Sequence, residues 1–172
     1  MLSLFDKIRS AFMQEYKPVF KIPEGQQMPD FKLTDHEGGV FRISDIKSDW
    51  IVLFFYPQDN TPTCTKEACN IRDNFAELSK HSITVMGISP DDAASHQKFI
   101  KKFDLPYKLI VDTDHTIAEE LGIWSLKKFM GKVYEGIHRV TIVLKKDRTI
   151  HRYIYPVEST AHADQIMKAI ES

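Results

Sequence analysis

One apolar stretch constrains the fold of this chain more than any other, and it runs from Trp50 to Tyr56. A short uninterrupted run of β-branched and aromatic residues is typical of a strand that is covered on both faces of a sheet. A helical pattern from Cys64 to Lys80 follows, and a second apolar strand is predicted from Ile83 to Ile88. Because strand, helix and strand follow one another directly, this part of the chain is predicted to form a βαβ unit of an α/β protein.

The remaining sequence continues this alternation. Further elements are predicted as a helix from about Asp91 to Phe103, a strand from Tyr107 to Val111, a short helix around Thr116 to Leu121, strands from His138 to Leu144 and from Thr149 to Tyr155, and a last helix from about Ser159 to Ile170. Only Lys145–Arg148 separates the two late strands, so we expect an antiparallel hairpin there. This order is that of a thioredoxin-like α/β fold, a central mixed β-sheet flanked by helices, although other mixed α/β folds share it. No internal repeat or linker divides residues 21–172, which are predicted to form one domain.

Residues 1–20 are predicted to be a separate amphipathic helical extension. If the segment from Leu2 to Tyr16 is helical, its apolar residues fall on one stripe: Leu2, Phe5, Ile8, Phe12, Met13 and Tyr16. We expect this helix to pack on its own domain or on a second subunit, so the sequence is compatible with a monomer and with a dimer. Binding to a membrane surface is the weaker alternative, because Asp6 and Glu15 offset most of the nearby basic charge.

The charge balance and the apolar pattern exclude several classes of function. The chain has 23 basic and 24 acidic residues, so its overall charge gives no affinity for nucleic acid. No apolar run approaches the roughly 18 residues that a transmembrane helix needs. Charged residues also interrupt the N-terminal segment where a secretory signal would be apolar, and two cysteines are too few for a disulfide-stabilised secreted fold. We therefore expect a protein of the cytoplasm.

The first cysteine lies where a helix is predicted to begin, directly after the central strand. Threonine is a good N-cap and proline favours the first helical position, so Thr61 and Pro62 are predicted to start the helix. Cys64 is then its third residue, where the helix dipole and free N–H groups stabilise a thiolate. The alternative is a buried structural thiol, because Cys64 also lies on the apolar arc of Ala68 and Ile71.

The second cysteine, Cys69, follows five residues later. On an ideal helix the two Cα atoms would be roughly 8 to 9 Å apart and on different faces. A disulfide needs Cα atoms closer than about 7 Å, so the pair could form only after the first helical turns unwind. A half-exposed, unreactive thiol is the alternative for Cys69.

Metal or nucleotide binding is disfavoured. A Cys-x4-Cys pair without a second pair of ligands is not a zinc motif, and the seven histidines form no cluster in the sequence. Asp112-Thr-Asp114 is better explained as a turn before the His115 helix than as a metal site. No Gly-x-Gly-x-x-Gly or P-loop sequence is present, so no nucleotide cofactor is expected.

The loop around Cys64 resembles a known family. Pro57-x-x-x-Thr61-x-x-Cys64 is similar to the signature of peroxiredoxins, and the further Cys69 resembles their bacterioferritin comigratory (Q-type) subfamily. Similar segments follow in the same order: Gly87-Ile-Ser-Pro-Asp91, Ser95-His-Gln-Lys-Phe99, Leu105-Pro106, Asp112-Thr-Asp-His115, Leu121-Gly-Ile-Trp124 and Met130 to Arg139. The chain departs from the pattern at Thr63, where many relatives have glycine, and at the Lys145–Arg148 turn. Neither departure removes a reacting group.

The resemblance implies a thiol peroxidase without cofactor or metal. Cys64 would attack a hydroperoxide and become a sulfenic acid, and Cys69 would resolve it as an intramolecular disulfide that thioredoxin or a similar dithiol protein reduces. Thr61 and Arg139 would stabilise the reacting groups, and Pro57 would shield the sulfur from water.

Alternatives to a peroxidase are kept for comparison. If the family resemblance is set aside, Thr61 is explained as a helix cap, Arg139 as a charge on a strand surface and Pro57 as a turn proline. A redox sensor would use the same thiols but would oxidise once without sustained turnover. A non-catalytic interaction module would leave Cys64 unreactive, and a thioredoxin-type oxidoreductase is disfavoured because the chain has no Cys-x-x-Cys pair.

Overall fold

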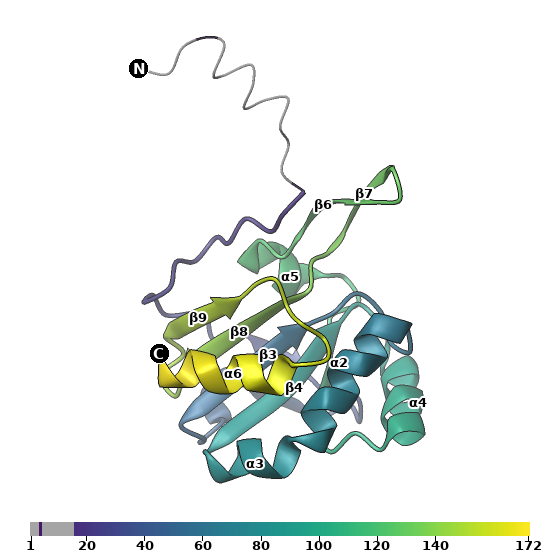
Figure 1. Ribbon diagram of the computed structural model, residues 1–172. Helices are drawn as coiled ribbons and strands as arrows, with labels where there is room; N and C mark the ends of the chain where they lie inside the picture. The colour runs from purple at the N-terminus through teal and green to yellow at the C-terminus, as the bar shows by residue number, and fades with distance from the viewer. Residues whose placement is uncertain (1–3, 5–15) are drawn as a thin grey trace.

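The computed structural model describes residue 4 and residues 16–172 (Figure 1). The N-terminal helix predicted for the segment from Leu2 to Tyr16 lies almost entirely outside the described residues. That helix and the division at residue 20 therefore stay predictions.

A five-stranded mixed sheet forms the centre of the molecule, in the order β5-β4-β3-β8-β9. The strands are β3 (Trp50–Phe55), β4 (Ile83–Ser89), β5 (Leu109–Val111), β8 (Val140–Lys145) and β9 (Ile150–Ile154). The central strand β3 pairs in parallel with β4 and antiparallel with β8. The β4 and β5 pair is parallel, and β8 and β9 form the predicted antiparallel hairpin. The predicted thioredoxin-like arrangement of a mixed sheet is thus confirmed.

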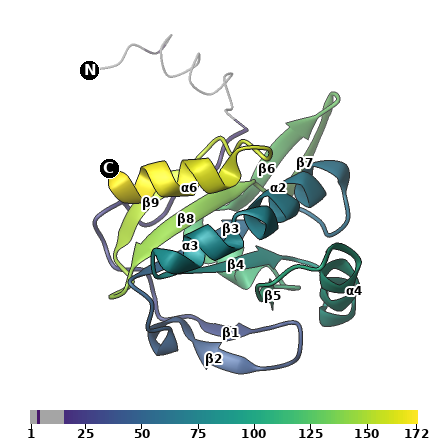
Figure 2. The same ribbon diagram turned by 60° about the horizontal axis from the view of Figure 1, so that its bottom comes forward.

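Both faces of the sheet are buried, which explains the uninterrupted apolar sequence of β3. Ile51, Leu53 and Phe55 point into one core, and Val52 and Phe54 point into the other. The helices are α2 (Pro62–Asp73), α3 (Phe75–Lys80), α4 (Ala93–Phe103), α5 (Thr116–Leu121) and α6 (His162–Glu171). Figure 2 shows α2, α3 and α6 together over one face, where their apolar residues join the core of Val52 and Phe54. Helix α5 packs into the other core.

The prediction of one helix from Cys64 to Lys80 is wrong, because the chain breaks at Asn74. This residue ends α2 and precedes α3 with non-helical angles, φ −109 and ψ 8. Its side-chain amide donates to the Asn70 carbonyl oxygen at 2.8 Å. A short polar side chain that bonds nearby backbone competes with the helix, and this accounts for the break. The apolar spacing continues across it, since Leu78 of α3 remains buried in the same core.

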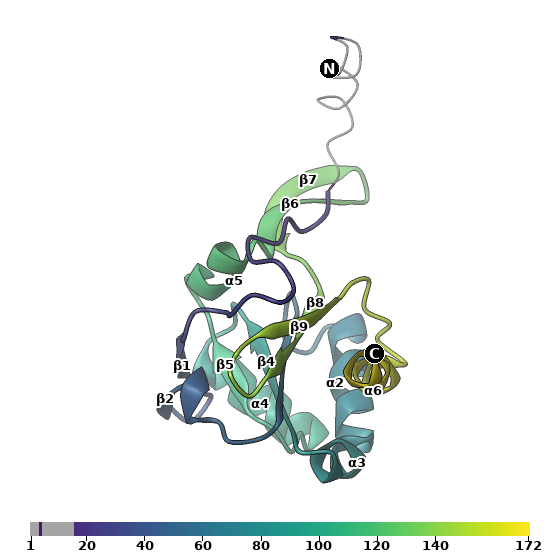
Figure 3. The same ribbon diagram turned by 90° about the vertical axis from the view of Figure 1, so that its left-hand side faces the viewer.

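Two small hairpins were not predicted. One joins β1 (Lys32–Thr34) and β2 (Val40–Arg42) ahead of the 3-10 helix η1 (Ile43–Asp45), and the other joins β6 (Trp124–Phe129) and β7 (Lys132–Ile137). The second projects beyond the body of the molecule (Figure 3), and most of its residues are not buried, so it lacks a continuous apolar pattern. Its turn residues Met130 and Gly131 both have positive φ, as a type I′ hairpin requires.

The strand predicted from His138 begins two residues later, at Val140. His138 and Arg139 lie in the connection between β7 and β8 instead. The reading of Arg139 as a charge on a strand surface is therefore wrong, and the position of this side chain depends on the connection.

Candidate active site

Cys64 lies in the first turn of α2, as predicted. Thr61 occupies the N-cap position and Pro62 opens the helix, so Cys64 is its third residue. The thiol is also buried, with 2% of the residue exposed, and it belongs to the core that contains Ala68 and Ile71. The two alternatives drawn from the sequence therefore describe the same position, a core residue at the positive end of a helix.

Arg139 brings a second positive group to this thiol. Its guanidinium Nη2 donates a hydrogen bond to the Cys64 Sγ at 3.2 Å, and its Nη1 donates to Glu67 Oε2. Burial alone would lower the pKa of Arg139, but the charges of Glu67 and Cys64 raise it. The guanidinium therefore stays charged and joins residues of α2 to the connection between β7 and β8.

Sequence reasoning missed Glu67, although a signal for it was present. It lies three residues after Cys64 on α2, so the two side chains share one face of the helix. Its side chain is fully buried, and this burial raises its pKa to about 7 although Arg139 acts in the opposite direction. An acidic residue on the buried face of a helix indicates a partner for a buried cation.

The structure places Thr61 and Pro57 in the loop that leads from β3 to α2. Thr61 holds the cap position, but its side chain forms no capping hydrogen bond, because its hydroxyl donates to the Gln58 carbonyl oxygen at 3.1 Å. Pro57 is half-buried in the same loop. Both therefore lie in the loop that leads into the first turn of α2, which contains Cys64.

A buried network anchors this loop through Asp59. Its carboxylate accepts hydrogen bonds from the Tyr56 hydroxyl at 2.6 Å and from the Ser95 hydroxyl at 2.8 Å, and its Oδ2 lies 2.8 Å from His96 Nδ1. The Asp59 N–H donates to Asp91 Oδ2 at 2.8 Å. Asp59, Asp91 and His96 also place three ligand atoms within 4.8 Å of one another. Because protein groups already bond these atoms, the cluster is explained as an anchor of the loop to α4.

Cys69 lies on the same unbroken helix as Cys64, which confirms the placement assumed from the sequence. Both thiols are free, and Cys69 is half-buried.

The acidic pair Asp112 and Asp114, considered above as a metal site, lies at the start of α5. Asp112 accepts hydrogen bonds from the backbone N–H groups of Ile117 and Ala118 at 3.1 Å each. The predicted turn ahead of that helix is confirmed.

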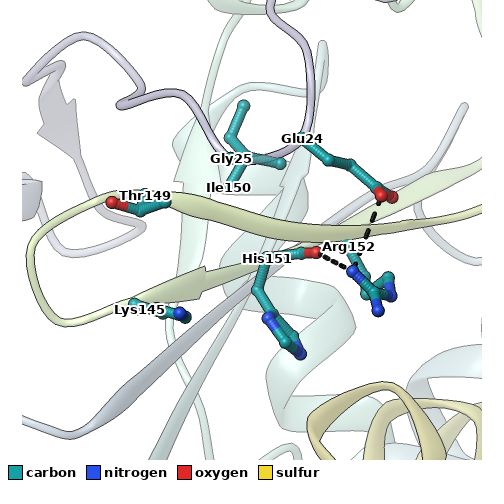
Figure 4. A pocket seen from close by; sticks show the side chains of 7 residues that line it. All are labelled: Glu24, Gly25, Lys145, Thr149, Ile150, His151 and Arg152. Carbon is teal, nitrogen blue, oxygen red and sulfur yellow. Dashed lines mark hydrogen bonds and ion pairs between the residues drawn. The ribbon is translucent and has the colours of Figure 1, made fainter. Parts of the chain in front are cut away.

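A surface cavity of about 350 Å³ lies elsewhere on the molecule, at β9 (Figure 4). Its lining residues are Glu24, Gly25, Lys145, Thr149, Ile150, His151 and Arg152. Arg152 Nη1 forms an ion pair with Glu24 Oε2 at 3.6 Å. The cavity contains neither cysteine nor Arg139, so it is separate from the candidate site.

These features first define a class of protein. A buried cysteine in the first turn of the helix after the central strand, bonded by an arginine, on a thioredoxin-like fold, is the arrangement of a thiol-based redox protein. The family model described as AhpC/TSA family matches residues 24–153. The chain therefore belongs to the AhpC/TSA family.

Relatives narrow the assignment to peroxiredoxins. The chain is 38% identical to a putative peroxiredoxin bcp of Coxiella burnetii over 146 residues, which cover 85% of this chain and 97% of that protein. It is 37% identical to peroxiredoxin Bcp of Bacillus subtilis over 147 residues, 86% of this chain and 94% of the relative. The protein is accordingly a peroxidase of the peroxiredoxin type.

Solved structures agree with this assignment. The crystal structure of peroxidoxin BcpB from Mycobacterium tuberculosis matches with a TM-score of 0.78 and 32% identity, covering 87% of this chain and 97% of that one. Peroxiredoxin Q of Xanthomonas campestris matches with a TM-score of 0.77 and 27% identity, covering 90% and 96%. Among the described residues, no helix is long and apolar enough to cross a membrane.

Proposed function

We propose that Cys64 is the residue of this peroxidase that attacks the hydroperoxide. The thiolate sulfur bonds to the terminal peroxide oxygen as the O–O bond breaks, so the sulfur loses two electrons and the peroxide gains them. The products are a Cys64 sulfenic acid and an alkoxide or hydroxide, which takes a proton from water and leaves as alcohol or water. The 3.2 Å hydrogen bond from Arg139 to the Cys64 sulfur is the observation that carries this proposal.

The other motif residues act around this step. Arg139 stabilises the thiolate first and the departing oxygen next, since its planar group has several donors. The Thr61 hydroxyl would leave the Gln58 carbonyl oxygen and turn toward the peroxide, which requires only a rotation of its side chain. Pro57 keeps the loop compact and limits the access of water to the sulfur.

Cys69 then resolves the sulfenic acid. Its thiolate attacks the Cys64 sulfur, an S–S bond forms, and the sulfenic oxygen leaves as water after taking up a proton. Both cysteines are on α2, where standard geometry separates their Cα atoms by roughly 8 to 9 Å. The first turns of α2 must therefore unwind before this bond can form.

A dithiol protein such as thioredoxin completes the cycle. One of its thiolates attacks the Cys64–Cys69 disulfide, and its second thiol releases both cysteines by exchange, which supplies two electrons per turnover. For the substrate, the solved bacterioferritin comigratory protein of Xanthomonas campestris is described as having alkyl peroxide reduction activity. We propose that this chain reduces organic hydroperoxides as well as hydrogen peroxide.

The test is peroxide-dependent NADPH oxidation through thioredoxin and thioredoxin reductase. The unsubstituted protein should sustain many turnovers, and Cys64→Ser should abolish them. Cys69→Ser should react once with peroxide and then stop with this reductant. A single oxidation of the unsubstituted protein, without further turnover, would instead identify a redox sensor.

A further inference from the structure

A histidine lies behind the arginine and glutamate pair, on a third element of the fold. His162 begins α6, and its Nδ1 lies 3.4 Å from Glu67 Oε1. Both side chains have no exposed surface. Within the described part of the chain, these two atoms are the buried side-chain nitrogen and oxygen that have no hydrogen-bond partner. Two unpartnered buried atoms that face each other indicate a shared proton.

The second nitrogen of His162 has a partner that works in either direction. Its Nε2 lies 2.7 Å from the Thr141 hydroxyl on β8. A hydroxyl can donate to a bare ring nitrogen or accept from an N–H. The imidazole can therefore carry its single proton on either nitrogen and still keep this hydrogen bond.

Burial shifts the pKa values of Glu67 and His162 in opposite directions. It lowers the pKa of His162 to about 3, and Arg139 adds to this effect, so the imidazole is neutral at physiological pH. Burial also raises the pKa of Glu67 to about 7, so this carboxyl changes charge near neutrality. A charged Glu67 can accept from Nδ1–H while Thr141 donates to Nε2, and a neutral Glu67 can donate to Nδ1 while Nε2–H donates to Thr141.

The charge of Glu67 affects Cys64 because both bind Arg139. With a thiolate at Cys64, a charged Glu67 would leave two anions on one guanidinium. Other ionisable groups near them are Lys127, whose Nζ donates to the Ile137 carbonyl oxygen, and Tyr107, whose pKa burial raises well above its usual range. Tyr107 donates to the Ala68 carbonyl oxygen, and its raised pKa keeps it uncharged.

We propose that His162 is a positioning residue for the reactive thiol. Its Nδ1 lies 3.4 Å from Glu67 Oε1 and can donate to a charged carboxylate or accept from a neutral carboxyl, so one buried proton decides whether Glu67 competes with Cys64 for Arg139. This inference rests on the proposed role of Cys64. It adds that Glu67 and Cys64 compete for one guanidinium, so loss of the proton from either group opposes its loss from the other.

The test is a titration of thiolate absorbance in the Cys69→Ser protein, which has Cys64 as its single cysteine. Because the Glu67 and Cys64 anions oppose each other, the unsubstituted site should titrate in a shallow curve with two coupled steps. Glu67→Gln removes one of the two titrating groups. The thiolate titration of this variant should therefore be a single step, with a midpoint about 1 pH unit below that of the parent.

Two substitutions of His162 distinguish a positioning role from a purely structural one. In His162→Gln the side-chain amide lies near the former Nε2 position, so the group that faces Glu67 is lost. The thiolate titration of His162→Gln should therefore show the single, lowered step of Glu67→Gln. Asn places its amide near Nδ1, so His162→Asn should retain the coupled curve. The Glu67→Gln and His162→Gln changes should give no further shift when combined. His151→Gln, at a half-buried histidine on β9, is the control and should titrate like the parent.

An unchanged curve for His162→Gln, or the same shift again in the Glu67→Gln background, would overturn the proposal. If His162→Gln does not fold, infrared difference spectra of the Cys69→Ser parent decide it. A protonated carboxyl band that is present at pH 6, lost by pH 8 and missing in Glu67→Gln is expected, and its absence would refute the proposal. Slow reaction of Cys64 with peroxide in every variant would contradict the proposed function instead.

Discussion

Arg139 shows at the scale of a single residue how the site combines burial with charge. Its guanidinium bonds Cys64 and Glu67 through different nitrogens, and its own side chain is only 18% exposed. An ammonium group is a compact charge and cannot match two separate acceptors with this planar geometry. The site therefore requires an arginine at this position, because a positive charge alone would not make both contacts.

Arg139→Lys is accordingly expected to slow the reaction of Cys64 with peroxide at least about tenfold, because the bidentate contact is lost while the charge is kept. The rate can be followed by rapid mixing with hydrogen peroxide, and circular dichroism should show an unchanged fold. Equal second-order rate constants for variant and parent would remove Arg139 from the site.

The sequence predicts only part of this constellation. Cys64, Thr61 and Pro57 are close together in the sequence, so their shared loop is local information. Glu67 shares a face of α2 with Cys64, but its partner Arg139 comes from the connection before β8, and His162 reaches Glu67 only because α6 packs on α2, so neither contact could be predicted from local sequence. A buried pair that tertiary packing brings together leaves little trace in local sequence patterns.

At the scale of elements, α2 has two roles that conflict. It presents Cys64 to Arg139, and it holds Cys69 too far away for a disulfide unless its first turns unwind. Oxidation should therefore accelerate amide hydrogen exchange across residues 61–72, whereas β3 and β4 stay protected. Exchange measured by mass spectrometry on both redox forms checks this. Equal protection of the segment, with the Cys64–Cys69 bond verified, would contradict the unwinding mechanism.

The end of α5 is a second element with a strict requirement. Gly122 has φ +79, and a Cβ there would lie 1.8 Å from the Val19 carbonyl oxygen. The backbone of Val19 and Lys21 bonds to this helix end at 3.1 and 3.2 Å, so the helix end fixes the segment before β1. Gly122→Ala should lower the free energy of unfolding by more than about 2 kcal/mol, because both strain and overlap result. Urea unfolding measures this, with Gly25→Ala, where φ is also positive but no atom lies within 4 Å, as the matched control.

At the scale of the whole molecule, the central sheet and its helices were predictable because burial on both faces gives strong apolar patterns. The hairpin of β6 and β7 was not, since it projects from the body and most of its residues are not buried. The break at Asn74 was hidden for the opposite reason, because the apolar spacing continues through it.

Buried histidines set the response of the whole fold to acid. Burial lowers the pKa of His138 to about 4 and that of His162 to about 3, so the unfolded chain takes up protons below pH 6.5 that the folded chain does not. Their contribution to stability is present above that pH and is lost as the pH falls. Glu67 acts in the opposite sense, since its pKa of about 7 favours the folded state at low pH and this contribution is lost as the pH rises.

His138→Gln isolates one of these contributions, because Gln can still reach Ser125, whose hydroxyl lies 2.8 Å from His138 Nε2. Between pH 7 and pH 4 the free energy of unfolding should fall less in this variant than in the parent, by on the order of 1 to 2 kcal/mol. Glu67→Gln should show the reverse, a steeper fall, since it removes the group whose protonation stabilises the fold. Urea unfolding at the two pH values measures all three proteins. Equal pH dependence of the parent and His138→Gln would show that this histidine gains its proton without any cost to the fold.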